Sequence, residues 1–253
     1  GMRETPPLLV LDRVRKQFGG VVAIKEASLQ VPRGKVVGII GPNGAGKTSI
    51  FNVITGAYKA DGGSIHLDGA AIQHLKPYQI ARQGIARTFQ NIRLFSTMTV
   101  WDHLLVSQPH GHSPLRLVLP ASWANPAAIE RAEEVLEFFG LEAFRHRLAK
   151  SLPYGIQRRV EIARAVTASP NLLLLDEPVA GMNNEEGEEL HQLLGRLRET
   201  GLTILLIEHD MPFVMQVCDY LYVLDFGEVI AEGDPASVRN DPVVLDAYLG
   251  QGA

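Results

Sequence analysis

The stretch VVGIIGPNGAGKT, residues 36–48, joins a short apolar run to a glycine-rich loop that ends in lysine and threonine. Such an apolar run is typical of a buried strand, and GPNGAGKT (41–48) matches the phosphate-binding P-loop pattern. In this motif backbone N–H groups wrap phosphate oxygens, and the following helix adds its dipole. We expect Lys47 to bridge the β- and γ-phosphates and Thr48 to hold Mg²⁺. The predicted phosphate-binding residues are Gly41, Pro42, Asn43, Gly44, Ala45, Gly46, Lys47, Thr48 and Ser49.

A second apolar run, NLLLLDEP (171–178), ends in two adjacent carboxylates. Ligands bind at the carboxyl ends of parallel strands, so Asp176 is predicted to bind Mg²⁺, directly or through water. Glu177 is predicted to act as the general base that activates water. On its own, an Asp-Glu pair favours a solvated turn. The P-loop in the same chain favours the catalytic interpretation.

Strand patterns extend on both sides of these motifs. LLVLDRV (8–14) and VVAIKEASLQV (21–31) flank a Phe-Gly-Gly turn and predict paired strands. Further on, NLLLLD, a helix over 184–200 and LTILLIE (202–208) alternate, which indicates a parallel sheet. YLYVLDFGEVIAEG (220–233) predicts a hairpin that turns at Phe226 and Gly227.

Helical spacing supports three further predictions. The helix over 184–200 is expected to bury one stripe of leucines. A second helix is predicted from Ala128 to Phe139 and ends at Gly140. DPVVLDAYLG (241–250) predicts a short closing helix. The leucine stripe comprises Leu190, Leu193, Leu194 and Leu197.

The segment SQPHGHSPLRLVLPASWANP (107–126) predicts an irregular insertion, because it contains four prolines. We interpret His110 and His112 as loop histidines, because no further Cys, His or acidic ligand is spaced to complete a metal site with them.

Composition limits the function classes. Hydrophobic residues make up 46% of the 253 residues, and the net charge of -4 gives no basic excess, so nucleic acid is not expected as a partner. No apolar run approaches the roughly 20 residues that span a bilayer. The sequence at the N-terminus has no apolar signal region, so we expect a cytosolic protein. The lone cysteine, Cys218, is expected to be a buried structural thiol.

Gln90 and His209 are weak signals individually, but their order in the chain is informative. The succession of P-loop, Gln90, LPYGIQRR (152–159), the acidic pair and His209 resembles the ATP-binding cassette (ABC) ATPases. This resemblance implies that Gln90 senses Mg²⁺ and the attacking water, and that His209 contacts the γ-phosphate. It also implies that Phe18 stacks on adenine.

The resemblance also implies an α/β fold of the P-loop NTPase type, with a mixed sheet core, an antiparallel β subdomain and a helical subdomain. Residues 8–253 are expected to form a single ABC ATPase domain. Within it, 8–95 and 166–253 form the nucleotide-binding core, and 96–165 the helical subdomain.

Several segments narrow the resemblance: ARTFQNIRLFSTMTVWDHL (86–104), DEPVAGMN (176–183) and the ending AYLG (247–250). They are similar to the ATPase subunits of branched-chain amino-acid importers. That branch implies ATP and Mg²⁺ as cofactors, two membrane permease subunits, a second ATPase subunit or a second copy, and indirectly a periplasmic binding protein. It places the chain at the cytoplasmic face of the inner membrane. Transport of urea, lipid-linked export and an ATP-gated regulatory module with little hydrolysis remain open.

The family signature Leu-Ser-Gly-Gly-Gln is altered in this chain to Leu-Pro-Tyr-Gly-Ile (152–156). In the family this segment completes the ATP site of the opposite subunit, so Pro153, Tyr154 and Gly155 are predicted to contact that nucleotide. Proline is tolerated at a first helical position, where we expect Pro153. The lost hydroxyl and N–H predict a trans site whose turnover is slowed about ten- to a hundredfold.

Overall fold

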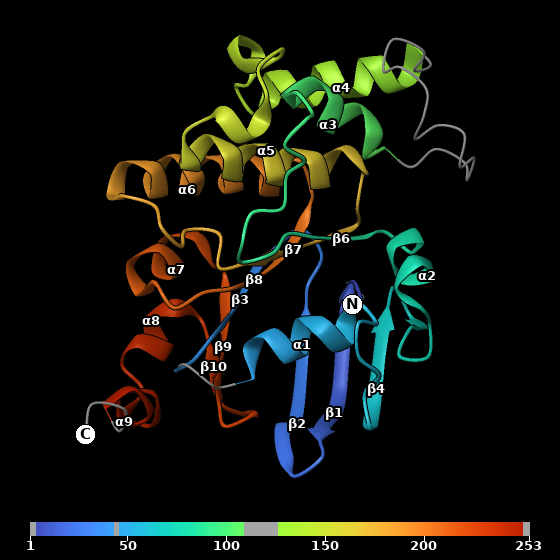
Figure 1. Cartoon of the computed structure of the whole chain (residues 1–253). Helices are drawn as coiled ribbons and strands as arrows, with labels where there is room; N and C mark the ends of the chain where they lie inside the picture. Colours follow the sequence, from blue (N-terminus) through green and yellow to red (C-terminus); the bar gives the residue numbers. More distant parts are fainter. Residues whose placement is uncertain (1–3, 43–45, 109–125, 250–253) are drawn as a thin grey trace.

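The strand that leads into the P-loop lies at the centre of the structure, a computed structural model that describes residues 4–42, 46–108 and 126–249. All five residues of this strand, β3 (Val36–Ile40), are buried. It pairs in parallel with β8 (Thr203–Ile207) and β9 (Tyr220–Asp225). Helix α1 (Lys47–Ile54) follows the loop and packs back against the sheet (Figure 1). The predicted strand–loop–helix order is confirmed.

Among the described residues the strands form one ten-stranded sheet in the order β5-β4-β1-β2-β10-β9-β3-β8-β7-β6. The strands β7 (Leu172–Asp176) and β6 (Ile85–Arg87) extend the parallel part beyond β8. Both β7 and β8 are buried at all five positions. Continuous burial follows because apolar clusters pack on both faces of these strands.

The other side of the sheet is largely antiparallel. It contains β1 (Leu9–Phe18), β2 (Val21–Val31), β4 (Gly62–Leu67) and β5 (Ala70–Ala71). The predicted pairing around the Phe-Gly-Gly turn is confirmed. Strand β10 (Glu228–Gly233) forms the predicted hairpin with β9. Phe226 and Gly227 have φ values of 47° and 75°, which suit a tight two-residue hairpin turn. The predicted mixed α/β sheet is therefore confirmed.

Three helices lie together at one end of the molecule (Figure 1): α3 (Val100–Val106), α4 (Pro126–Phe138) and α5 (Tyr154–Thr167). Short 3₁₀ turns at Glu142–Phe144 and Ala149–Ser151 connect the last two. The helix predicted from Ala128 is confirmed, and Gly140 follows it with φ 64°. Helix α5 continues two residues past the expected boundary at 165. His110, His112 and most of the predicted insertion lie outside the described residues.

The remaining helices are α2 (Pro77–Arg82), α6 (Asn184–Glu199), α7 (Met211–Val217), α8 (Pro235–Arg239) and α9 (Pro242–Leu249). The leucine stripe predicted for α6 is buried. The side chain of Asn183 caps this helix by accepting a hydrogen bond of 2.8 Å from the N–H of Glu186. Cys218 is buried as predicted, and burial raises the pKa of its thiol. Within the described part of the chain, no helix combines the length and apolar character needed to cross a bilayer.

Candidate nucleotide site

The P-loop residue Gly46 has a backbone conformation that other residues avoid. Its φ is 91°, and a Cβ at this position would lie 2.3 Å from the backbone oxygen of Ala23. Glycine is required here by the conformation and by the close approach to β2. Helix α1 begins at the next residue, so the free N–H groups of its first turn lie at the loop. The predicted residues Asn43, Gly44 and Ala45 lie outside the described residues.

Lys47 is buried at the first position of α1. Its Nζ donates a hydrogen bond of 2.7 Å to the carbonyl oxygen of Gly41. Burial lowers the pKa of Lys47, and the carboxylates of Glu177, Glu208 and Asp176 oppose that shift. The ammonium group therefore lies in the electric field of the carboxylates at the carboxyl ends of β7 and β8.

The carboxylate of Asp176, which ends β7, is buried. Its Oδ2 lies 3.4 Å from Nη2 of Arg87, while its Oδ1 is buried with no hydrogen-bond partner among the described residues. Burial raises the pKa of Asp176; Arg87 opposes this shift and Glu177 adds to it. A buried carboxylate oxygen without a partner fits a site that a cation completes.

The residues predicted for Mg²⁺ differ in exposure. Thr48 and Gln90 are exposed, and Asp176 is buried. No cluster of three His, Cys, Asp or Glu side chains able to hold a metal occurs in the described ranges. One carboxylate, a hydroxyl and an amide oxygen suit Mg²⁺, which binds few protein oxygens and completes its shell with water and phosphate. The donor set fits this ion, and the assignment stays a prediction.

Glu177 has a strained backbone, with φ 47°. Non-glycine residues in this region are uncommon and cluster at functional sites. Its N–H donates a hydrogen bond of 2.9 Å to the carbonyl of Ile207 at the end of β8. Its Oε1 lies 3.2 Å from Nδ1 of His209, a residue 32 positions away in the chain. The fold thus brings two predicted catalytic residues into contact.

The buried carboxylate of Glu208 was not predicted as part of the site. It accepts hydrogen bonds of 3.3 Å and 3.1 Å from the N–H groups of Val179 and His209. Burial raises the pKa of Glu208, and these backbone donors oppose the shift. Glu208 therefore fixes the two loops that carry Glu177 and His209. Its position directly after an apolar run of the sequence, like that of Asp176, was the available signal.

Arg87 was also not predicted. It ends β6, next to β7, and its Nη1 donates a hydrogen bond of 2.7 Å to Oδ1 of Asn52 in α1. Arg87 also forms an ion pair with Asp176, in which the two side chains are 9% and 4% exposed. Arg87 therefore bridges the helix after the P-loop and the acidic strand. A single arginine within ARTFQ carries no pattern from which to infer this.

Gln90 follows three residues after Arg87 and is exposed, and its carbonyl accepts a hydrogen bond from Arg158. Phe18 lies at the end of β1, opposite Val21 in the hairpin. Phe18 is 40% exposed, and the centroid of its ring lies 4.9 Å from that of Tyr58. An exposed ring is available for stacking, and its adenine-binding role stays a prediction.

The altered signature segment requires one correction. Pro153 does not occupy the first helical position; it caps α5 with φ -53° and ψ 150°, and the helix begins at Tyr154. Its carbonyl accepts hydrogen bonds of 3.0 Å from the N–H groups of both Ile156 and Gln157. Proline fits because the extended backbone of a cap position includes the φ that its ring imposes. The hydroxyl of Tyr154 is bonded to Arg158, and a Cβ at Gly155 would lie 3.0 Å from Cδ of Glu186.

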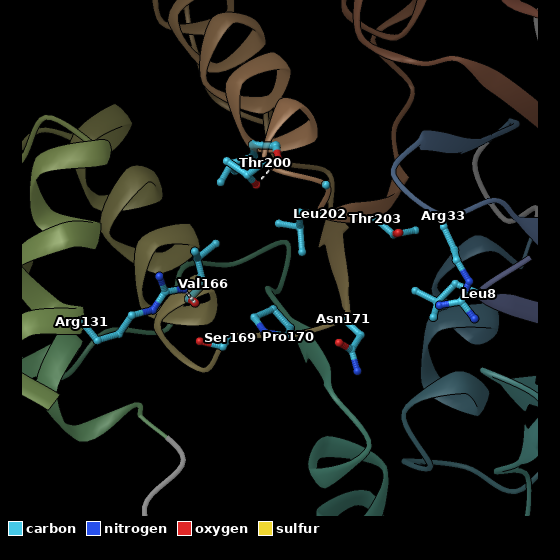
Figure 2. A pocket seen from close by; sticks show the side chains of 12 residues that line it. Leu8, Arg33, Arg131, Val166, Ser169, Pro170, Asn171, Thr200, Leu202 and Thr203 are labelled. Atoms are coloured by element: carbon cyan, nitrogen blue, oxygen red, sulfur yellow. Dashed lines mark hydrogen bonds between the residues drawn. The ribbon is translucent and has the colours of Figure 1, made fainter. Parts of the chain in front are cut away.

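A hollow of about 230 Å³ lies beside this segment and includes Pro153, Gly155 and Glu186 in its lining. A larger pocket of about 390 Å³ lies at the opposite end of the parallel strands (Figure 2). Asn171 there precedes β7, and Thr203 begins β8. None of the residues that line this larger pocket belongs to the predicted site, so it is a separate feature.

A P-loop after the central parallel strand, opposed by an acidic pair at the end of β7, defines an ATPase of the P-loop class. Comparison with known proteins agrees. The family model described as ABC transporter matches residues 24–180. A second model, for branched-chain amino acid ATP-binding cassette transporters, matches residues 228–253. The chain belongs to the ABC transporter family and is an ATPase subunit that binds nucleotide.

Curated relatives match over almost the full chain. The high-affinity branched-chain amino acid transport ATP-binding protein BraF of Pseudomonas aeruginosa is 45% identical, covering 97% of this chain and 98% of that protein. The high-affinity branched-chain amino acid transport ATP-binding protein LivG of Escherichia coli strain K12 is 44% identical, again covering 97% of this chain and 98% of that protein.

Solved structures agree with these relatives. The ADP conformation of MJ1267, an ATP-binding cassette of an ABC transporter, is 35% identical with a TM-score of 0.86, covering 97% of this chain and 100% of that one. The dimeric post-hydrolysis state of the cassette MJ0796, bound to ADP and Pi, is 28% identical with a TM-score of 0.75. That match covers 90% of this chain and 98% of the other.

Proposed function

We propose that this chain is the ATP-hydrolysing subunit of an importer for branched-chain amino acids. The observation that carries the proposal is the meeting of two predicted catalytic residues, Glu177 and His209, beside the buried Asp176 and the field of Lys47. The relatives that are named for branched-chain amino acid transport support the substrate class.

Each residue of the site acts on ATP through its own chemistry. Lys47 exchanges its hydrogen bond with Gly41 for the β- and γ-phosphate oxygens. Glu177 accepts the proton of the attacking water, and His209 holds that carboxylate and contacts the γ-phosphate. Thr48, Asp176 and Gln90 would hold Mg²⁺, which when bound would neutralise charge on the phosphates.

The remaining predicted residues complete the nucleotide site at its two ends. Phe18 stacks on adenine, and Pro153, Tyr154 and Gly155 face the nucleotide of the opposite subunit. We further propose the division of one ABC ATPase domain, 8–253, into a nucleotide-binding core of 8–95 and 166–253 and a helical subdomain of 96–165.

The proposed assembly contains two membrane permease subunits and either a second ATPase subunit or a second copy of this chain. A periplasmic binding protein delivers substrate to it, and the chain lies at the cytoplasmic face of the inner membrane. The family match and the relatives named for transport support this arrangement. The dimer of the MJ0796 cassette supports pairing of two ATPases.

The test of the ATPase role is Glu177→Gln in the complex reconstituted with both permeases. ATP affinity is expected to be retained, and hydrolysis is expected to fall at least about a hundredfold because the amide is no base. Glu185→Gln, at an exposed glutamate in the first turn of α6, is the matched control and keeps the parental rate. Parental turnover in Glu177→Gln would show that another group activates the water.

The substrate class has a separate test. Leucine, isoleucine and valine, presented with the binding protein, are expected to stimulate ATP hydrolysis and to accumulate in vesicles, while urea does neither. Stimulation by urea alone assigns another substrate. A parental complex that binds ATP and shows no turnover with any substrate assigns the regulatory role instead.

A further inference from the structure

Arg158, in the second turn of α5, is the largest completely buried side chain among the described residues. Its Nη1 donates a hydrogen bond of 2.8 Å to the carbonyl oxygen of Phe89, and its Nη2 donates one of 2.7 Å to that of Gln90. Residues 89 and 90 lie between β6 and α3, outside any helix or strand. Arg158 therefore holds the backbone at the predicted catalytic residue Gln90.

Glu161, three residues along α5, completes this contact. Its Oε1 accepts the hydrogen bond of 2.8 Å from Arg158, and its Oε2 accepts one of 3.1 Å from the N–H of Arg93. The ion pair is 0% and 1% exposed. Burial raises the pKa of Glu161, and Arg158 opposes the shift. The helix thus holds the segment 89–93 at both ends.

Tyr154 links the same arginine to the start of the helix. Its hydroxyl accepts a hydrogen bond of 3.1 Å from Nη2 of Arg158. Its ring packs against Gly181, where a Cβ would lie 3.2 Å from Cε1 of the tyrosine. Gly181 belongs to the loop that follows Glu177. The tyrosine that replaces a signature glycine therefore connects the start of α5 to two other parts of the site.

Stability alone does not account for this arrangement. Replacing a buried ion pair with apolar residues of similar size is often neutral or stabilising. The fork of a guanidinium group, by contrast, fixes the direction of two successive carbonyls, which no apolar side chain does.

We propose that Arg158 is a positioning residue: with Glu161 and Tyr154 it forms a latch that ties Gln90 to the start of α5. The proposal rests on the proposed roles of Gln90 and the signature segment. A shift at the start of α5, which is proposed to face one nucleotide, then moves Gln90 at the other nucleotide of the dimer. The latch gives the two ATP sites a direct mechanical connection through one helix.

The test is Arg158→Met, studied by hydrogen–deuterium exchange of the nucleotide-free subunit and by hydrolysis in the reconstituted complex. Exchange of the peptide containing 89–95 is expected to accelerate about tenfold, because the loop loses two anchors and Glu161 its counter-ion. The kcat is expected to fall about tenfold while ATP affinity stays within about twofold. Arg158→Lys restores the charge without the fork and is expected to recover part of the loss.

Arg131→Met is the matched control, because Arg131 donates to the carbonyl of Val166 at the far end of α5 and lies in the separate pocket of Figure 2. It is expected to leave exchange of 89–95 and kcat unchanged. Tyr154→Phe removes one hydroxyl. The kcat is expected to fall two- to threefold, which is less than the tenfold fall expected for Arg158→Met. It keeps the test decisive where circular dichroism shows Arg158→Met to be unfolded.

Two results overturn the latch. One is a folded Arg158→Met variant in which residues 89–95 exchange hydrogen at the same rate as in the parent. If Arg158→Met does not fold, the equivalent result is an unchanged kcat in Tyr154→Phe. The other is a uniform loss of thermal stability and ATP affinity with kcat unchanged, which describes a purely structural arginine. If the parental complex hydrolyses ATP, either result leaves the proposed function standing. If the parental complex is inactive, the proposed function is refuted. The latch is then still tested by hydrogen–deuterium exchange of 89–95 in the nucleotide-free subunit.

Discussion

Replacing Arg87 with methionine removes the cation that faces the buried carboxylate of Asp176. The two side chains are 9% and 4% exposed and are 3.4 Å apart. Arg87 also donates to Asn52 and lies over the ring of Phe89 at 4.5 Å. Methionine retains most of the apolar volume, so the loss is chiefly electrostatic.

The expected loss follows from these contacts. Removing one partner of a buried ion pair costs about 3–5 kcal/mol, because the other charge stays buried. The value for Arg87→Met lies at the low end, about 3 kcal/mol, since the contact is long for a charge-assisted hydrogen bond. About 1 kcal/mol of this belongs to the hydrogen bond with Asn52, which leaves about 2 kcal/mol for Asp176.

A double-mutant cycle separates the two parts. Urea unfolding of the nucleotide-free subunit is measured for the parent, Arg87→Met, Asp176→Asn and the double variant. In the Asp176→Asn background, Arg87→Met is expected to cost only about 1 kcal/mol, so the coupling energy is about 2 kcal/mol. Arg93→Met, which loses contact with the same Phe89 ring, is the control and is expected to cost about 0.5 kcal/mol.

An equal cost of Arg87→Met in both backgrounds would refute the electrostatic argument. A total loss of stability below about 1 kcal/mol in Arg87→Met would also refute it, because so small a loss would mean that water, and not Arg87, stabilises the charge of Asp176. The second result would also remove the case for a cation at its unpartnered oxygen.

Two further predictions concern the backbone and the pH. Gly46→Ala is expected to abolish nucleotide binding and to lower the free energy of urea unfolding by at least about 2 kcal/mol, because φ at Gly46 is 91° and a Cβ there would meet the backbone of Ala23. The control is Gly187→Ala in α6, where a Cβ meets no other atom, and this variant should lose no stability. Burial lowers the pKa of His103 below 6.5 in the folded protein. The neutral imidazole therefore contributes fully to folding stability above pH 6.5. This contribution is lost as pH falls through the lowered pKa, by up to about 1.4 kcal/mol per pH unit. His103→Gln should remove this component of the pH dependence of urea unfolding; identical profiles for the parent and this variant would contradict it.

Much of the fold was predictable because its signals are local. The P-loop strand is an unbroken apolar run, and the hairpin turn at Phe226 and Gly227 requires two residues with positive φ in succession. The helix predicted over 184–200 follows from its leucine stripe, and the structure places it at Asn184–Glu199. Each of these features depends on residues within one element, so periodicity and turn chemistry suffice to find it.

The partners of the buried charges were not predictable from the same patterns. Arg87 meets Asp176 at a separation of 89 residues, and Arg158 meets Gln90 at one of 68. In the sequence these arginines look like ordinary charged residues of a strand end and a helix face. Their burial is decided by which strand lies next to β7 and by what packs under α5, and both are properties of the assembled sheet.

The altered signature illustrates the same limit. The sequence places Pro153 one residue too far into the helix, because a proline suits the cap and the first turn equally well. The helical position that follows is Tyr154, whose hydroxyl is already bonded to Arg158. A glycine there has no side chain with which to reach that arginine. The exchange of glycine for tyrosine therefore adds an internal contact, which ties the start of α5 to Gln90 and to the loop after Glu177. The contact to phosphate that Pro153 is predicted to lose and this contact within the subunit are expected to have opposite effects on turnover in a dimer, because the first loss weakens the closed state and the second contact pre-organises it.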